Sequence, residues 1–139
     1  VVFGGTNDYG HGDAPLGRMT DRTNSTFYGA MHNLCRALIE RYPRSLIIVI
    51  TPMHRLNEEE LVNERGVRNV ATLSDYVNAE RRVAEYYSLP LLDLYASSSL
   101  NPEVPEIQKL FMPDGLHPND AGHELIAKRL FAFLKNLSV

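Results

Sequence analysis

The chain contains three short apolar runs, and each is followed by a longer segment with helical periodicity. The runs are Val1–Phe3, Leu46–Ile50 and Pro90–Tyr95. Their aliphatic and β-branched composition predicts strands. The middle run has no polar interruption, which is typical of a strand buried on both faces.

The periodic segments predict three helices, over residues 27–42, 72–87 and about 119–137. Pro43 ends the first, and the Thr72-x-x-Asp75 pattern is a capping box that opens the second. The third carries one apolar face, formed by Ile126, Leu130, Phe133, Leu134 and Leu137. The segments 9–26, 53–71 and 96–118 lack these patterns and are predicted to be loops.

Alternation of strands and helices predicts an α/β fold with a parallel sheet and right-handed crossovers. The expected architecture is a three-layer α/β/α sandwich with a flavodoxin-like sheet, whose strand order is 2-1-3-4-5. The three strands would be its third, fourth and fifth, so the first strands are missing and a strand from an N-terminal segment would pair with Val1–Phe3. We therefore expect residues 1–139 to be the C-terminal part of one domain.

Composition narrows the class of protein. The net charge is -3 over 139 residues, and scattered Lys and Arg residues argue against a nucleic-acid surface. No apolar run approaches the ~20 residues that span a bilayer, so no membrane partner is expected. Cys35 is the only cysteine, which excludes an intrachain disulfide and favours a small buried side chain on a helix. A single cysteine fits the cytoplasm without excluding export.

Chemistry-bearing residues follow the predicted strands. Asn7 follows the first strand, His54 the second, and Asp114 and His117 lie in the loop after the third. The carboxyl ends of parallel strands share one rim of a sheet, where ligands bind. An Asp three residues before a His, in a turn with Gly115 and Pro118, can orient the imidazole as a general base. Either motif alone is also compatible with a plain turn.

Together these motifs resemble the SGNH, or GDSL-type, serine hydrolase family. Gly5-Thr6-Asn7-Asp8 corresponds to its third conserved block, and Asp114, His117 and Pro118 correspond to its fifth. The flanking Val-Val-Phe-Gly-Gly and Asn-Asp-Ala-Gly-His stretches agree, and the similarity covers essentially the whole chain.

The resemblance implies a role for each residue. His117 would be the general base, Asp114 would orient its ring, and Asn7 would donate a hydrogen bond to the oxyanion. The family's nucleophilic serine lies in a Gly-Asp-Ser block after the first strand, which this sequence lacks. None of its serines has that context, so we expect the nucleophile in an N-terminal segment of the same protein and no activity from these 139 residues alone.

Three further residues, Gly5, Tyr9 and His54, are expected to contact substrate; a solvated loop position is the alternative for His54 and for His11. The Gly5–Gly12 stretch is similar to that of bacterial relatives resembling carbohydrate acetylesterases, which favours a small ester, such as an acetylated sugar, as substrate. No cofactor is expected.

Two other functions stay open at this point. One is a non-catalytic protein that keeps the fold. The other is a metal-dependent phosphoesterase using Asp8, His11, His54, Asp114 and His117, although no two histidines have the spacing of helical metal ligands, so no metal site is expected. Away from the rim, Asp93 is expected to accept a structural hydrogen bond, and His32 and His123 to lie on the surface.

Overall fold

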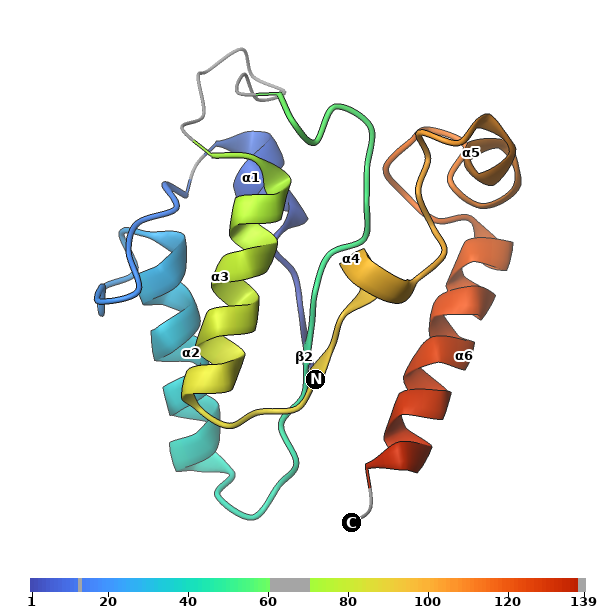
Figure 1. Cartoon of the computed structure of the whole chain (residues 1–139). Helices are drawn as coiled ribbons and strands as arrows, with labels where there is room; N and C mark the ends of the chain where they lie inside the picture. Colours follow the sequence, from blue (N-terminus) through green and yellow to red (C-terminus); the bar gives the residue numbers. More distant parts are fainter. Residues whose placement is uncertain (13, 61–70, 138–139) are drawn as a thin grey trace. The chain divides into compact units, whose positions relative to one another are not determined.

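The structure, a computed structural model, describes residues 1–12, 14–60 and 71–137 (Figure 1). The elements are β1 (Val2–Phe3), α1 (Thr6–His11), α2 (Phe27–Arg41), β2 (Val49–Ile50), α3 (Leu73–Tyr86), β3 (Leu91–Leu92), α4 (Leu94–Ser97), α5 (Pro105–Phe111) and α6 (Asp120–Asn136). They belong to two compact units. The N-terminal unit contains Val1–Pro52 and Glu58–Leu91, and the C-terminal unit contains Met53–Asn57 and Leu92–Val139.

The strands form one sheet in the order β1-β2-β3. β1 and β2 are parallel, and the Val2 N–H donates to the carbonyl of Ile48 at 2.8 Å. Residues 47–50 are buried, as the uninterrupted apolar run predicts. The parallel α/β arrangement is therefore confirmed, although the strands are shorter than the apolar runs that contain them.

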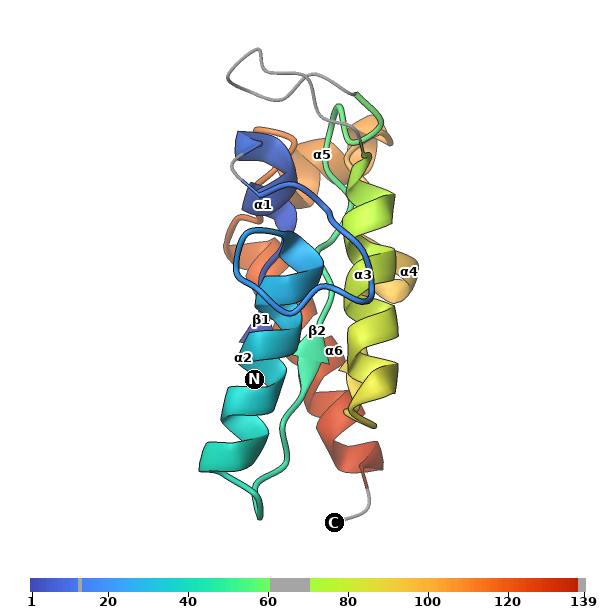
Figure 2. The ribbon, with the colours of Figure 1, turned by 90° about the vertical axis from the view of Figure 1, so that its left-hand side faces the viewer.

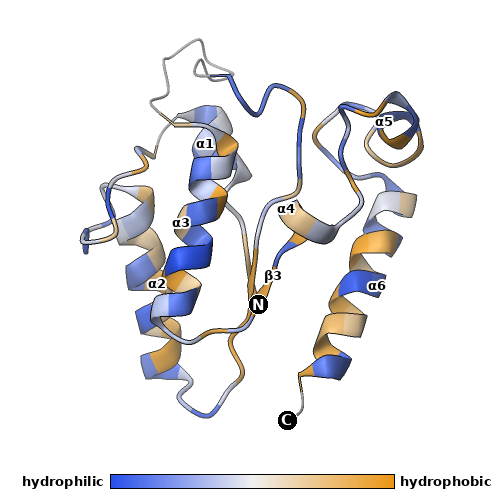
Figure 3. Cartoon of the chain, viewed as in Figure 1, coloured by the Kyte–Doolittle hydropathy of each residue, from blue (hydrophilic) through white to orange (hydrophobic). Residues whose placement is uncertain are grey.

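In the N-terminal unit, α2 and α3 pack side by side over one face of β1 and β2 (Figures 1 and 2). Hydrophilic and hydrophobic residues alternate along both helices (Figure 3), since one side of each faces the core. The predicted capping box opens α3, where the Thr72 N–H donates to the Asp75 carboxylate at 2.8 Å. Both helices thus begin and end within a residue of their predicted bounds.

Cys35 lies on the buried side of α2 and is fully inaccessible, as predicted. Burial raises the pKa of its thiol to about 11, and the nearby carboxylate of Glu80 adds to this. The residue therefore behaves as a small apolar side chain of the core.

The prediction that residues 9–26 form a continuous loop was wrong, because α1 occupies residues 6–11. Tyr9 on α1 is buried, its ring lies edge-on to that of Tyr76, and its hydroxyl donates to the carbonyl of Glu60 at 2.7 Å. A helix of six residues that includes Gly10 has little intrinsic helix preference, so tertiary contacts of this kind account for it.

The prediction of a surface position for His32 was also wrong. This α2 residue is fully buried, with Nε2 3.0 Å from the carbonyl of Met19 and Nδ1 3.2 Å from the hydroxyl of Tyr87. A neutral ring meets both partners, Nε2–H donating to the carbonyl and Nδ1 accepting from the tyrosine. Burial lowers the pKa of His32, and the positive charge of Arg22 lowers it further.

The C-terminal unit corrects two further predictions. The strand predicted to extend to Tyr95 ends at Leu92, and the loop predicted over 96–118 contains α5 and the end of α4. Asp93 caps α4 by accepting from the Ala96 N–H at 3.0 Å, which confirms its structural hydrogen bond. Hydrophobic periodicity does not predict helices this short, because they contain too few residues to show a repeat.

Asn119 joins α5 to α6. Its side chain accepts from the Gly122 N–H at 3.0 Å and donates to the carbonyl of Leu110 at 2.9 Å, while its backbone N–H donates to the carbonyl of Phe111. The predicted final helix is confirmed, and the expected surface position of His123 is borne out.

Part of the predicted loop over 53–71, residues 61–70, lies outside the described residues. Within the described ranges, no helix combines the length and the apolar character that crossing a bilayer requires.

Candidate active site

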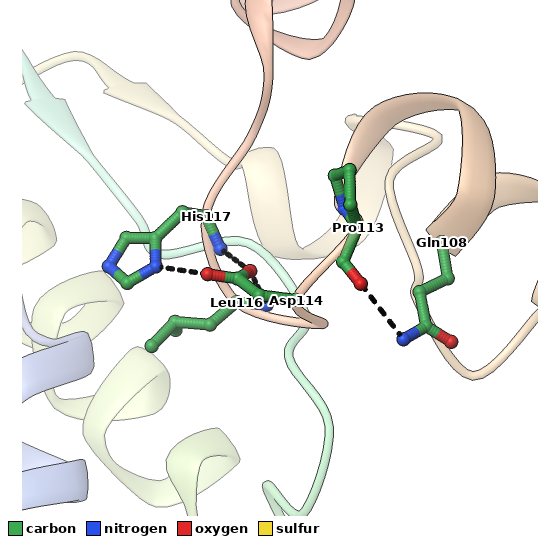
Figure 4. Close-up of polar contacts among 5 residues, drawn as sticks. All are labelled: Gln108, Pro113, Asp114, Leu116 and His117. Carbon is green, nitrogen blue, oxygen red and sulfur yellow. Dashed lines mark hydrogen bonds and ion pairs between the residues drawn. The ribbon is translucent and has the colours of Figure 1, made fainter.

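The turn that carries Asp114 and His117 is built on a buried anchor. Met112 is fully buried, and its carbonyl accepts from the Gly115 N–H at 2.8 Å, which closes the turn. Gly115 has φ +76°, a left-handed conformation that glycine adopts without the steric cost of a Cβ. On the outer side of the turn, the Gln108 side chain donates to the carbonyl of Pro113 at 3.4 Å (Figure 4).

Asp114 holds both the turn and the imidazole. One carboxylate oxygen accepts from the backbone N–H groups of Leu116 and His117 at 2.8 and 2.7 Å. The other lies 2.6 Å from Nδ1 of His117 (Figure 4). An ionised carboxylate can only accept, so Nδ1 carries the proton and Nε2 keeps a lone pair. Nε2 points away from Asp114, and the His117 side chain is 74% exposed.

The same contacts change the acidity of Asp114. Its pKa is lowered to about 2, first by the His117 backbone N–H, then by the His117 side chain and the Leu116 N–H. Hydrogen bonds donated to a carboxylate favour its charged form. Asp114 is therefore an anion throughout the neutral and mildly acidic range, available to stabilise a positive charge on His117.

Residues 53–57 contact this turn and are hydrogen-bonded to it. The Leu56 N–H donates to the carbonyl of Gly115 at 2.9 Å. A Cβ built on Gly115 would overlap the Leu56 side chain. From the sequence, Gly115 was predictable only as a turn former and Leu56 was missed, because the two are 59 positions apart and no local pattern connects them.

His54, in this same unit, lies against an aromatic partner. Its ring centroid is 3.9 Å from that of Tyr95, with the planes inclined by 32°. Tyr95 had been assigned to a strand and was missed as a site residue. Asp93 at the N-cap of α4 was the signal for the helix that carries it.

The other predicted site residues belong to the N-terminal unit. Gly5 is buried with φ +103° and precedes α1, Asn7 is exposed on the first turn of α1, and Tyr9 is in the core. The structure thus brings together Asp114 and His117. The convergence of Asn7, Gly5 and Tyr9 with them stays a prediction.

Metal ligation was considered for the same rim. Among residues 1–12, 14–60 and 71–137, no three His, Cys, Asp or Glu side chains are gathered so that they could hold a metal ion.

Comparison with known proteins identifies the family. The profile of the GDSL-like Lipase/Acylhydrolase family matches residues 1–125, so the chain belongs to this family. The resemblance inferred from the motifs is confirmed, as is the α/β fold of SGNH hydrolases. Among curated protein sequences, none matches significantly.

Solved structures give the same result. One crystal structure is 36% identical over 98% of this chain, with a TM-score of 0.85. A protein from Lactobacillus plantarum is 34% identical over 99% of the chain (TM-score 0.86), and a possible lipase from Chitinophaga pinensis is 26% identical over 98% (TM-score 0.71). The chain spans 63%, 66% and 71% of the lengths of these three relatives.

The hydrogen bonds to Asp114 predict how it titrates. We expect the carboxyl carbon of Asp114 to titrate near pH 2 in carbon-13 NMR, below its ordinary value of 3.8. Because the folded-state pKa is lowered, the stabilisation from these bonds is present above pH 3.8 and is lost as the pH falls through about 2. His117→Ala keeps the two backbone N–H donors to Asp114 but removes the imidazole donor. The midpoint of Asp114 in this variant should therefore lie between about 2 and 3.8. A wild-type midpoint at or above 3.8 contradicts the hydrogen-bond assignment.

Gly115→Ala should distort the turn for two separable reasons, the positive φ and the overlap with Leu56. We expect it to lower the free energy of unfolding by more than the ~1 kcal/mol typical of a strained backbone alone, measured in urea. Adding Leu56→Ala relieves only the overlap, so Gly115→Ala should cost less in that background than in the wild type. Equal costs in both backgrounds would show that Leu56 does not confine the turn.

Proposed function

We propose that the protein hydrolyses carboxylic esters through an acyl-serine intermediate, with His117 as general base and Asp114 as its positioning residue. The observation that carries the proposal is the 2.6 Å contact between Asp114 and Nδ1 of His117, made by a carboxylate that two backbone N–H groups already hold. Membership of the GDSL-like lipase/acylhydrolase family supports this reaction class.

The proton steps follow from the tautomer. Nε2 of His117 takes the proton of the serine hydroxyl as the serine oxygen attacks the ester carbonyl, and the resulting imidazolium is stabilised by the Asp114 anion. The imidazolium then gives the proton to the departing alcohol, which leaves an acyl-serine. A water molecule, deprotonated by the same nitrogen, attacks the acyl group, and collapse of this second intermediate releases the acid and returns the serine.

Asn7 is the proposed oxyanion donor. Its side-chain amide, exposed at the start of α1, can donate to the oxygen that becomes negative when the carbonyl is attacked. A contact of this kind typically stabilises the transition state by ~3 kcal/mol. Gly5, the buried N-cap of α1, would position that amide through its backbone, because its φ of +103° is a conformation that glycine adopts readily.

The serine belongs, in this proposal, to a segment that precedes Val1 in the same protein. The Gly-Asp-Ser context of the family's nucleophile is absent from the sequence, and the chain spans only 63% and 66% of two solved relatives. The 139 residues alone should accordingly be inactive.

The substrate class we propose is an acetylated sugar. The rings of His54 and Tyr95, which are partly exposed, form an aromatic pair in the same unit as the Asp114 turn, and the segment that carries His54 is hydrogen-bonded to that turn through Leu56. Sugar rings present apolar C–H faces that pack on aromatic rings of this kind. Tyr9, buried in the N-terminal unit, would support the part of α1 that carries Asn7 rather than touch the sugar.

Substitution of the catalytic residues gives the test of mechanism. In the protein that includes the preceding segment, His117→Ala should lower kcat/KM for a simple acetyl ester by at least ~10³-fold, and Asp114→Asn by ~10⁴-fold. Asn7→Ala should lower kcat by ~10²–10³-fold with little change in KM, because its bond forms in the transition state. A fluorophosphonate should label a serine upstream of Val1, as seen by mass spectrometry.

Matched controls come from the same unit. His123→Ala and Asp120→Asn alter the same residue types at exposed positions of α6 and should leave kcat/KM unchanged. Full activity of His117→Ala, or ester hydrolysis by the 139-residue chain alone, would rule out the proposed assignment of base or nucleophile.

The substrate proposal has its own test. Tyr95→Leu should raise KM for an acetylated sugar by about three- to tenfold, the range expected for loss of one aromatic contact. Its KM for a small ester with no sugar ring should not change. Tyr95→Phe keeps the ring and should behave as wild type. Equal effects of Tyr95→Leu on both substrates would show that the stacked pair supports the fold rather than the sugar.

A further inference from the structure

An acidic residue, Glu80, interrupts the buried side of α3. That side is otherwise apolar or aromatic and is formed by Leu73, Tyr76, Val77, Ala79, Val83 and Ala84. Glu80 itself is only 2% exposed. A carboxylate in such a position costs free energy because it loses its contact with water, and an apolar side chain of similar volume is often at least as stabilising. Stability of the helix alone therefore does not explain a glutamate here.

The end group of Glu80 lies against the backbone of Gly5. A Cβ built on Gly5 would lie 2.5 Å from Oε1 of Glu80 and 3.2 Å from Cγ of Pro52, which follows β2. Oε1 therefore occupies the space in which any other residue would carry its Cβ. Gly5 is buried, is the N-cap of α1 and has φ +103°. Its turn is thus enclosed by Glu80 and Pro52, and all three residues belong to the N-terminal unit.

α3 contacts α1 at a second point, four residues before Glu80. The ring centroid of Tyr76 is 6.2 Å from that of Tyr9, with the planes inclined by 65°. Residues four apart lie on the same side of a helix, so one side of α3 supports both the N-cap of α1 and its following turn. Asn7 lies between these two supported positions. Two contacts fix the direction of a short segment, whereas a single contact leaves it free to pivot.

We propose that Glu80 is a positioning residue for the Asn7 amide, because its carboxylate oxygen fixes the Gly5 turn from which the proposed oxyanion donor projects. The inference rests on the proposed function, in which Asn7 donates to the oxyanion. An oxygen atom suits this space because it is smaller than a methyl group, and carbon atoms in contact stay ~3.5–4.0 Å apart. A methionine at position 80 would have the length of glutamate but would end in a methyl group, so that either this group or the Gly5 turn would have to move.

Substitution of Glu80 separates positioning from stability. In the protein that includes the preceding segment, Glu80→Met should lower kcat for a simple acetyl ester ~10-fold with little change in KM, because a displaced donor loses part of the ~10²–10³-fold that such an amide supplies. Its urea midpoint should be no lower than that of the wild type, since an apolar side chain replaces a buried carboxylate. Glu80→Gln keeps the small planar end group and should retain kcat within about threefold. The matched variant Glu85→Met changes an exposed glutamate of the same helix and should behave as wild type.

Combination with Asn7→Ala tests whether Glu80 acts through Asn7. In the Asn7→Ala background, Glu80→Met should change kcat by less than about twofold, because the group that it displaces is already absent. An unchanged kcat in Glu80→Met, equal losses in Glu80→Met and Glu80→Gln, or the same loss with and without Asn7 would each overturn the inference.

NMR of the same proteins separates this inference from the proposed function. The side-chain amide resonances of Asn7 should shift in Glu80→Met and stay in place in Glu80→Gln and Glu85→Met. A shift together with full kcat in Asn7→Ala supports the positioning contact and refutes the oxyanion role. A large loss of kcat in Asn7→Ala without any shift in Glu80→Met supports the oxyanion role and refutes the positioning contact.

Discussion

The carboxylate of Asp114 accepts three hydrogen bonds at once, and the chemistry available to this protein depends on that arrangement. Two bonds close the backbone turn and the third sets the tautomer of His117. Since the same group fixes the loop and the ring, the imidazole is oriented by the backbone that carries it rather than by a distant partner. An exposed histidine would otherwise sample several rotamers, and its Nε2 would keep this direction only part of the time.

Much of this turn was predictable from sequence, because Asp114, Gly115 and His117 act over three or four positions and local geometry suffices. The same holds for α2, α3 and α6, where periodicity and capping residues agree. What escaped prediction depends on distant contacts. α1 exists because Tyr9 packs on Tyr76, and His32 is buried because carbonyl and hydroxyl groups 13 and 55 positions away meet its two nitrogens.

The order of strands and helices along the chain distributes the candidate site residues over both units. In a parallel sheet each strand contributes the loop at its carboxyl end, so a site assembled there takes residues from segments far apart in the chain. Asn7 follows β1 in one unit and His117 follows β3 in the other. This is why residues far apart in the sequence could be predicted as candidates for one site, although no local pattern connects them.

Cys35 has a practical consequence. The reactive form of cysteine is the thiolate, and with a pKa of about 11 roughly one thiol in several thousand is ionised near pH 7.5, inside a core that excludes reagents. Peroxide, iodoacetamide and maleimide dyes should therefore not react with Cys35. A cysteine introduced anywhere on its surface would be the one that takes up a label, so fluorescent or spin-labelled derivatives need no prior removal of the natural thiol.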